Sequence, residues 1–314
     1  MTSEKLIGAV DIGGTKIAVG AVTREGEIVA RLECPTAPEK GFDRAMHNVK
    51  AMLREAAERA GASWEGIGVA CPGPLDPFTG IIGDVGTLPT WQDGNLVAAL
   101  EPEFGVPVAV ENDCDAAALA EVNCGGAKGS ERFIYITISS GIGGGIIFWG
   151  KLYRGPNGAH PELGHQVIDA SGPLCYCRAR GCWESLASGP AMSAWMRGQP
   201  GGPELTAAEI CKFAEEGDPL ARKCMEREGY YVGVGLANLI TLFTPDAITL
   251  GGGVMKSSHL FLDRAREVIR EICTQVPAAK TRIIPASLGP NTGLAGAAQA
   301  WRARHARTPG AFCA

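Results

Sequence analysis

Residues 6–22, LIGAVDIGGTKIAVGAV, are the stretch that decides the fold of this sequence. Leu6–Val10 is an apolar run typical of a buried strand, Asp11–Thr15 contains the glycines of a tight turn, and Lys16–Val22 resumes the β pattern. Residues 132–149 repeat the same strand–turn–strand arrangement later in the chain. The repetition predicts two related halves instead of one continuous Rossmann sheet.

Strands and helices alternate over the rest of the chain, which favours an α/β fold. Helical spacing of apolar residues predicts helices, and short apolar runs between turn residues predict strands. The expected helices cover residues 41–61, 114–122 and 292–305, and the expected strands cover residues 66–70, 106–110, 247–250 and 282–285.

A chain of 314 residues is longer than one hydrophobic core comfortably supports, so we expect two domains. Residues 1–115 form the smaller, N-terminal α/β domain in this prediction. Residues 116–299 form the larger α/β domain, which contains a cysteine-rich loop at 155–184. A C-terminal helix over about residues 300–314 is expected to pack back on the first domain.

The composition excludes several classes of protein. Hydrophobic residues make up 46% and charged residues 20% of the chain, which is incompatible with intrinsic disorder. The formal net charge of -5 leaves no sequence-wide basic surface for a nucleic-acid partner. Residues 133–150 are uncharged, but their central glycines and serines predict two strands and a turn, so no membrane partner is expected.

Cysteine usage indicates the cellular compartment. The 11 cysteines are too few for a disulfide scaffold, and their number is odd. The first residues show no apolar signal segment before a small-residue cleavage site. We therefore expect a cytoplasmic protein, in which clustered cysteines favour metal binding or catalysis over disulfides.

The first glycine turn has the residues of a phosphate site. Gly13 and Gly14 let the backbone approach a polyphosphate, and Thr15, followed by Lys16, offers a hydroxyl donor. Asp11 is able to hold a water bound to Mg²⁺. The spacing matches neither a P-loop nor the Rossmann fingerprint, and a glycine pair of this kind also occurs in turns that only reverse the chain.

Two later glycine clusters resemble the first turn in composition. One lies between the two strands of 132–149, and the other follows the strand 247–250, where the backbone is able to approach an adenine or a ribose. Three such clusters favour nucleotide binding over three unrelated turns. The residues concerned are Ser140, Gly141, Gly143 and Gly144 in the second cluster, and Gly252 and Gly253 in the third.

One imidazole and three thiols within a short segment predict a metal site. His165, Cys175, Cys177 and Cys182 match a Cys₃His set, which binds Zn²⁺ tetrahedrally. Because four protein ligands fill the coordination shell, this zinc would be structural. The alternative is a group of buried free cysteines.

Several carboxylates are placed where they have a chemical use. Asp113 follows Asn112 at the end of a predicted strand, so it is either the N-cap of the next helix or a base for an attacking hydroxyl. Glu162 and Glu184 flank the predicted metal ligands, and carboxylates fixed in this way suit a ligand rich in hydroxyls.

Taken in order, these motifs resemble the ROK proteins (repressors, open reading frames, kinases) over about residues 5–300. The pattern of Glu-x-Gly-His with the cysteine motif is the most specific part of the resemblance. The motifs are Asp11-x-Gly-Gly-Thr-Lys, Pro72-Gly73-Pro-Leu-Asp76, Asn112-Asp113, Gly141-x-Gly-Gly-Gly, Glu162-x-Gly-His165 and Cys175-x-Cys177-x₄-Cys182-x-Glu184.

The resemblance implies a hexokinase-like fold of two actin-like (ribonuclease-H-like) domains with an interdomain cleft and a zinc-bound loop. It implies ATP-dependent phosphorylation of a hexose, foremost glucose, at the 6-hydroxyl, with Asp113 as the catalytic base, and it implies a homodimer. The turn residues from Asp11 to Thr15 and from Ser140 to Gly144 would hold ATP and Mg²⁺. The implied sugar-contacting residues are Gly73, Thr87, Asn112, Asp113, Glu162, His165 and Glu184.

Two departures from the family pattern leave the substrate open, and a third, Arg178, concerns the conformation of the cysteine loop. Thr87 stands where glucokinase-like members have a sugar-contacting Asn, a change that resembles N-acetylmannosamine kinases. His160-Pro161-Glu162 resembles ROK fructokinases. Arg178 replaces a Gly of the cysteine motif and costs energy if the position needs a positive φ. A sugar-sensing ROK regulator is the alternative outside the enzymes, although the first predicted strand begins near residue 5 and leaves no room for a helix-turn-helix before it.

Overall fold

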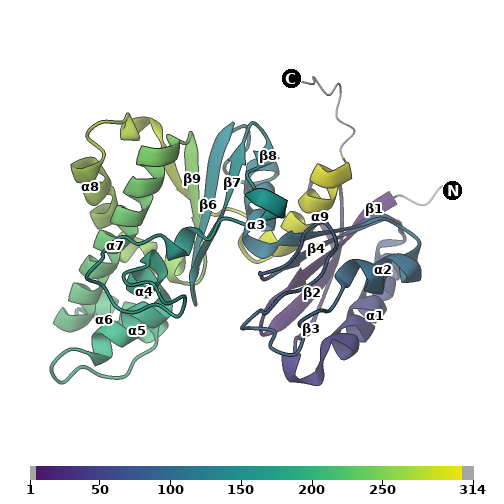
Figure 1. Cartoon of the computed structure of the whole chain (residues 1–314), viewed down its shortest axis with the longest axis horizontal. Helices are drawn as coiled ribbons and strands as arrows, with labels where there is room; N and C mark the ends of the chain where they lie inside the picture. Colours follow the sequence, from purple (N-terminus) through teal and green to yellow (C-terminus); the bar gives the residue numbers. More distant parts are fainter. Residues whose placement is uncertain (1–4, 306–314) are drawn as a thin grey trace. The chain divides into compact units, whose positions relative to one another are not determined.

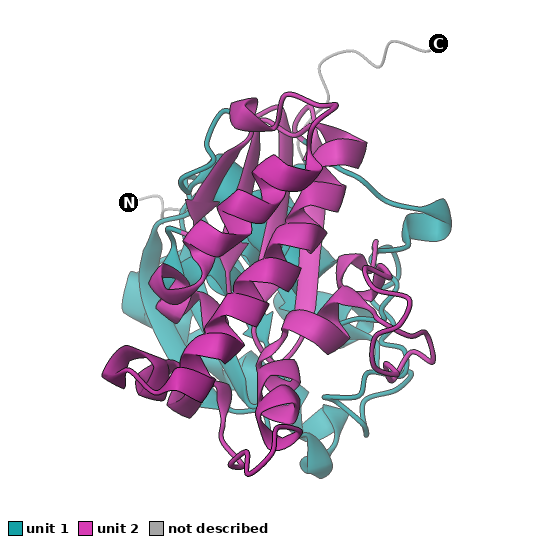
Figure 2. Cartoon of the chain, turned by 90° about the vertical axis from the view of Figure 1, so that its left-hand side faces the viewer, with its two compact units in different colours: residues 1–129, 151–160, 287–314 teal, residues 130–150, 161–286 magenta. Residues whose placement is uncertain are grey.

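The structure, a computed structural model, describes residues 5–305. The chain divides into two compact units, which Figure 2 colours separately. The first unit extends beyond the predicted boundary at residue 115 and takes in two later segments. The first unit comprises Met1–Gly129, Lys151–His160 and Ser287–Ala314, and the second comprises Ser130–Gly150 and Pro161–Ala286.

The first unit contains a mixed sheet with the strand order β3-β2-β1-β4-β5. The strands β1 and β2 pair antiparallel, as the strand–turn–strand pattern predicted, β3 pairs antiparallel with β2, and β1, β4 and β5 run parallel. Alternate residues of β1 face opposite cores: Ile7 and Ala9 join one cluster, and Val10 and Ile12 join the other. The strands are β1 (Lys5–Ile12), β2 (Lys16–Val22), β3 (Ile28–Pro35), β4 (Ser63–Cys71) and β5 (Val108–Asn112).

Helices cover both faces of this sheet (Figure 1). The helix α2 was missed by the sequence analysis, because it is only nine residues long and Pro102 lies inside it. The helices are α1 (Phe42–Ala60) and α2 (Leu96–Phe104) on one face, and α3 (Asp113–Asn123) and α9 (Thr292–His305) on the other.

The last helix of the structure packs closely on β4. A Cβ atom added at Gly68 would lie 1.8 Å from the carbonyl oxygen of Ala297, and one added at Gly66 would lie 2.0 Å from Nε1 of Trp301. These two positions of β4 therefore require glycine. The helix expected over residues 292–305 is present as α9, and it packs on the sheet of the first unit. Of the segment 300–314 that was expected to pack there, residues 300–305 belong to α9, and residues 306–314 lie outside the described part of the chain.

The second unit repeats the topology of the first. Its sheet has the order β10-β9-β6-β7-β8, in which β6 and β7 pair antiparallel while β6, β9 and β10 run parallel. Read from β8, this is the order of the first sheet, so the two sheets confirm the prediction of two related halves. The strands are β6 (Arg132–Ile138), β7 (Ile142–Phe148), β9 (Ala247–Gly251) and β10 (Arg282–Pro285), together with the two-residue edge strand β8 (Lys151–Leu152), whose segment Lys151–His160 is grouped with the first unit.

Helices of the second unit lie over its sheet, as Figure 2 shows, and pack into a single core with it. Short 3-10 helices occur in both units: η1 (Pro38–Lys40), η2 (Pro156–Gly158), η3 (Leu163–His165), η4 (Val254–Leu260), η5 (Ala278–Lys280) and η6 (Gly289–Asn291). The α-helices of this unit are α4 (Trp183–Ala187), α5 (Gly189–Arg197), α6 (Ala207–Glu216), α7 (Pro219–Phe243) and α8 (Leu262–Ile272). Among the helices between residues 5 and 305, none combines the length and the apolar content that crossing a bilayer demands.

One carboxylate lies inside the core of the second unit. Glu228 on α7 is fully buried, and neither of its oxygens has a hydrogen-bond partner. Burial raises the pKa of the Glu228 carboxyl to about 8, against the opposing charge of Arg227. The side chain is therefore protonated at neutral pH, because an unpaired anion in this position would be strongly disfavoured.

We predict that Glu228→Gln removes a pH dependence of stability. A raised carboxyl pKa contributes stability that is present below about pH 4.5 and is lost as the pH rises through about 8. The variant and the wild type should therefore melt alike at pH 5, and the variant should be more stable at pH 9, by about 1.4 kcal/mol per unit of pKa shift. Thermal unfolding of the wild type and the variant from pH 5 to 9 measures the difference in stability. The control is Glu226→Gln, an exposed change on the same helix. Equal melting temperatures of Glu228→Gln and the wild type at pH 9 would contradict the prediction.

Candidate functional site

Three parallel strands of the first unit end at one edge of the sheet. In the strand registers Asp11 of β1 lies opposite Ala70 of β4, and Cys71 of β4 lies opposite Asn112 of β5. Asp113 follows Asn112 directly as the first residue of α3. Two carboxylates and an amide that the sequence analysis singled out are thus brought to the same edge by the pairing of parallel strands.

Asn112 caps the helix that begins with Asp113. Its Oδ1 accepts hydrogen bonds from the backbone N–H groups of Cys114 at 2.8 Å and of Asp115 at 3.3 Å. The alternative in which Asp113 itself is the N-cap is therefore wrong. Asp113 Oδ1 accepts a bond of 2.8 Å from the Cys114 N–H, so its carboxylate is held at the positive end of α3.

The two aspartates interact through their charges. Burial, followed by the charge of Asp113, raises the pKa of Asp11 to about 6, against Arg31 and Lys16. Burial also raises the pKa of Asp113, whereas hydrogen bonds from Cys114 and the charge of His160 act in the opposite direction. A cation placed near both carboxylates would relieve this repulsion, which is the electrostatic condition for a Mg²⁺ site.

The first glycine turn lies beside the same edge. The Gly13 N–H donates to the Lys16 carbonyl at 2.9 Å, which closes the turn. A Cβ atom at Gly14 would lie 2.9 Å from Cβ of Thr87, so the predicted phosphate turn touches the predicted sugar-contacting residue. The ammonium group of Lys16 pairs at 3.0 Å with Glu33 on the exposed side of β3.

Gly73 is close to the helix cap. A Cβ atom at Gly73 would lie 3.1 Å from Nδ2 of Asn112, so Gly73 leaves room for the amide that follows β5. Gly73, Asn112 and Asp113 are therefore neighbours. The structure brings together, within the first unit, the residues that the sequence assigned to sugar binding and to catalysis in this part of the chain.

Two contacts between a basic and an acidic side chain flank Asp113, and the sequence analysis missed both. Glu111 of β5 receives Arg154, whose Nη1 lies 2.9 Å from Oε1, and Asp115 of α3 receives His160, whose Nδ1 lies 3.0 Å from Oδ2. Glu111 and Asp115 are buried. The sequence does contain a signal for these contacts, because acidic residues alternate at positions 111, 113 and 115. Where a strand ends and a helix begins, not all three side chains can face solvent, so the buried ones need basic partners.

The second glycine turn forms a corresponding site in the second unit. The Ser139 N–H donates to the Gly141 carbonyl at 2.8 Å, and the Ile142 N–H donates to Oε2 of Glu184 at 2.8 Å. Glu184, which was predicted to contact sugar, thus also holds the turn that was predicted to contact phosphate. Gly252, at φ 95°, packs on the carbonyl of Ile138 and brings the third glycine cluster to this turn.

A cavity of about 640 Å³ opens beside these two clusters. Its volume is that of a small-molecule site. The N-termini of α5 and α6 contribute to the lining, so the positive ends of two helix dipoles are near it. The lining includes the predicted nucleotide-binding residues Ser140 and Gly253, together with Ser139, Gly189, Ser193, Thr206, Cys211, Lys212, Glu215 and Lys256.

The predicted metal ligands form a cluster. One ligand atom from each of His165, Cys175, Cys177 and Cys182 lies within 4.8 Å of the others. The sulfur atoms of Cys177 and Cys182 are 3.5 Å apart, and Nδ1 of His165 is 3.6 Å from the sulfur of Cys175. Tetrahedral zinc with bonds of about 2.3 Å to sulfur needs separations close to these, whereas a disulfide needs about 2.05 Å. The donor set therefore fits Zn²⁺.

The segment around the cysteines has two features of its own. Arg178 adopts a φ of 74°, so the replacement of the family's Gly does place a side chain in the left-handed region, at an energetic cost. The hydroxyl of Tyr176 lies 2.9 Å from Nε2 of His165, the ring nitrogen that faces away from Cys175. A sugar hydroxyl can bond this nitrogen only if Tyr176 moves. Glu162 is exposed at the start of η3.

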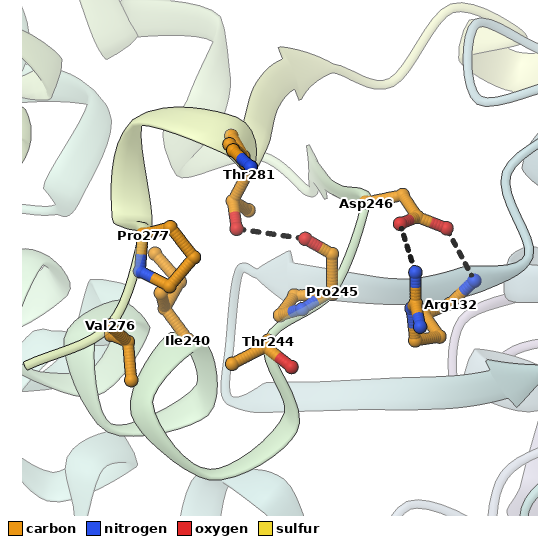
Figure 3. A pocket seen from close by; sticks show the side chains of 9 residues that line it. Arg132, Ile240, Thr244, Pro245, Asp246, Val276, Pro277 and Thr281 are labelled. Atoms are coloured by element: carbon orange, nitrogen blue, oxygen red, sulfur yellow. Dashed lines mark hydrogen bonds and ion pairs between the residues drawn. The ribbon is translucent and has the colours of Figure 1, made fainter.

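A smaller cavity of about 200 Å³ lies at the other end of the second sheet (Figure 3). Arg132, Asp246 and Thr281 stand at or just before the first residues of β6, β9 and β10, whereas the glycine turns follow the last residues of β6 and β9. Arg132 pairs with Asp246 at 3.1 Å, and Thr281 donates to the Pro245 carbonyl at 2.8 Å. The lining of this cavity includes none of the residues that were predicted to bind the nucleotide or the sugar.

Residues 7–304 match the ROK family. The chain belongs to the ROK family. This ROK protein is 34% identical over 312 residues to a glucokinase of Streptomyces coelicolor, a match that covers 92% of the chain and 95% of the glucokinase. Its fold is similar to the crystal structure of a ROK family glucokinase from Streptomyces griseus in complex with glucose and AMPPNP, with a TM-score of 0.74, 34% identity, and coverage of 93% of this chain and 98% of that one.

Regulators are also among the relatives of this ROK protein. It is 34% identical over 232 residues to the xylose repressor of Bacillus subtilis, a match that covers 74% of the chain but 59% of the repressor. The match therefore leaves a large part of the repressor without a counterpart in this chain.

We predict that Asp11→Asn stabilises this ROK protein in Mg²⁺-free buffer at pH 8. The raised pKa of Asp11 contributes stability that is present below about pH 4 and is lost as the pH rises through about 6, and the variant lacks this loss. The gain at pH 8 should reach up to about 3 kcal/mol and should vanish at pH 4. Chemical unfolding at both pH values measures it, with the exposed Glu58→Gln as the control. A variant less stable than the wild type at pH 8 would sink the prediction.

Proposed function

We propose that this protein transfers the γ-phosphoryl group of ATP to the 6-hydroxyl of a hexose, with glucose as the sugar and Asp113 as the general base. The observation that carries the proposal is the position of Asp113: a desolvated carboxylate at the start of α3, beside Asp11 and the first glycine turn. The glucokinases among the relatives, one of them crystallised with glucose and AMPPNP, support the choice of donor and sugar.

In phosphoryl transfer the protein mainly positions the reactants and stabilises charge, and it forms no covalent bond to them in this proposal. The sugar oxygen bonds to the γ-phosphorus as the bond from that phosphorus to the β–γ bridging oxygen breaks, ADP leaves, and the hydroxyl proton passes to Asp113. Asn112, beside the base, would orient the sugar, and the turn Gly13–Thr15 would approach the phosphates. Mg²⁺, which Asp11 would hold through water, supplies neutralising charge for the transferring group.

The second unit contributes the remaining ligands in this proposal. Ser140 and Gly141–Gly144, with Gly252 and Gly253, would bind ATP in and beside the 640 Å³ cavity. Glu162, His165 and Glu184 would bind sugar hydroxyls. A homodimer belongs to the same proposal, on the family resemblance alone.

A structural Zn²⁺ is the second part of the proposal. Nδ1 of His165 and the three cysteine sulfurs would complete a tetrahedral coordination shell. The ion would therefore stabilise the loop, and no position would remain for a nucleophilic water. The bond of Glu184 to Ile142 then links the metal loop to the second phosphate turn. Loss of zinc is thereby expected to disturb both sugar and ATP binding.

N-acetylmannosamine is a second candidate substrate, because Thr87 stands where glucokinase-like members have Asn. Thr87 contacts Gly14, which places the exchange at the predicted site and not on a remote surface. Fructose is tested with it, on account of the His160-Pro161-Glu162 sequence. The candidates share the phosphoryl transfer and differ in the sugar.

We predict that Asp113→Asn lowers kcat about 10²- to 10⁴-fold. The amide can still bond the sugar hydroxyl but cannot accept its proton, so KM for the sugar should change little. Coupled ADP release with glucose, mannose, fructose and N-acetylmannosamine measures turnover and chooses among the sugars. Asp43→Asn, an exposed change on α1, should keep wild-type rates. Wild-type protein that turns over none of these sugars, or an Asp113→Asn variant with unchanged kcat, would end the kinase proposal.

We predict that the purified protein contains zinc at one ion per chain and that Cys177→Ser loses it. Cobalt should replace the zinc and give a thiolate-to-metal charge-transfer band in the wild type. Chelation should lower the melting temperature of the wild type, because binding energy of a structural metal is folding energy. Cys34→Ser on β3 is the matched control and should retain the metal. Full metal content in Cys177→Ser would show that these four residues are not the ligands.

A further inference from the structure

Residues 151–160 are tied to the elements on both sides of Asp113. Arg154 pairs with Glu111, at the end of β5, and His160 pairs with Asp115, in the first turn of α3. The acids on which these pairs depend are two residues before and two residues after Asp113. We call residues 151–160 the strap, and the two pairs its anchors.

The side chains of both anchors are largely buried. The side chain of Asp115 is 0% exposed and that of Glu111 is 4% exposed, while Arg154 and His160 are 20% and 16% exposed. Arg154 is hydrogen-bonded to Glu111, and Nδ1 of His160 lies 3.0 Å from Oδ2 of Asp115, a contact that becomes an ion pair when the imidazole is protonated. Removing either basic side chain would leave a buried carboxylate uncompensated. The strap therefore has two fixed points against the base-bearing element.

The chain leaves the first unit directly after the second anchor. His160 is the last residue of the strap in the first unit, and Pro161 and Glu162 are the next two residues. Proline fixes its own φ and restricts the residue before it. Fixing His160 therefore limits the conformations that deliver Glu162, which belongs to the predicted sugar ligands.

We propose that His160 is a positioning residue for the phosphoryl transfer: its pair with Asp115 fixes the strap against α3 and so sets the place from which the chain presents Glu162 to the sugar. This inference rests on the proposed function for its kinetic consequence. The anchor itself is a property of the structure and is tested separately below.

The charges around Asp113 agree with this role. The charge of His160 lowers the pKa of Asp113, whereas that of Asp115 raises it. Arg154 likewise opposes the effect of burial on the pKa of Glu111. The strap thus places a guanidinium and an imidazole beside three acids that lie within five residues, while its geometry orients the residues that follow.

Kinetics of four variants test the proposal. His160→Ala should lower kcat/KM for glucose roughly 100-fold, the scale of a group misplaced by about 1 Å, and leave KM for ATP close to the wild-type value. His160→Asn should recover most of the loss, because its amide nitrogen reaches the place of Nδ1. The double variant His160→Ala/Asp115→Asn separates positioning from charge, because it removes the orphaned carboxylate but does not restore the anchor. His47→Ala, on the exposed face of α1, is the control and should behave as the wild type.

The outcomes decide between positioning and a structural role. Low glucose kcat/KM in the double variant, with rescue by His160→Asn, supports the proposal. Full activity in the double variant would overturn it, because only the unpaired charge would then have mattered. An equally large loss of kcat/KM for glucose and for ATP would also overturn the proposal, because it would indicate that the variant is misfolded or generally impaired.

Hydrogen exchange keeps the two proposals distinguishable. Amides of residues 151–160 should exchange faster in His160→Ala than in the wild type, whether or not the protein phosphorylates a sugar. Wild-type protein without kinase activity would refute the proposed function alone. Unchanged exchange in the strap would refute the anchor, even in a fully active enzyme.

Discussion

The pairing of three parallel strands, β1, β4 and β5, is the constraint on which the rest of the structure depends. Because these strands end at one edge, Asp11 and Asp113 are held in a partly desolvated region where each disfavours the charge of the other. The surroundings offset this cost. The start of α3, the bonds from Cys114 and the charge of His160 all favour the anionic form of Asp113. A site of this kind is ready for a cation and a hydroxyl.

The second unit uses the same topology with different chemistry. Thr137 of β6 lies opposite Gly251 of β9, where Asp11 of β1 lies opposite Ala70 of β4. The edge that bears carboxylates in the first unit therefore bears a hydroxyl, glycines and helix N-termini in the second. Acidic groups suit a metal ion and a proton, whereas glycine backbone and helix dipoles suit phosphate. One architecture thus provides two complementary surfaces.

Much of this was predictable from local sequence. The hairpin patterns around Gly13 and Gly141 identified two related sheets, and the spacing of His165 with the cysteines identified the cluster, because both signals are contained in short segments. Contacts between distant residues were not predictable. His160 and Asp115 are far apart along the chain, and only the folded structure shows that they pair. The Tyr176 hydroxyl on His165 was missed for another reason: no pattern specifies where a side chain in a loop points.

The fit of α9 on β4 has a consequence for the order in which the protein folds. The glycine face of β4 is covered by residues 292–305, whereas every residue of the second unit precedes residue 287. During synthesis the second unit therefore has its complete sequence before the first unit does, although the first begins earlier. The face of the N-terminal sheet that carries Gly66 and Gly68 therefore lacks part of its cover until residues 292–305 have been made.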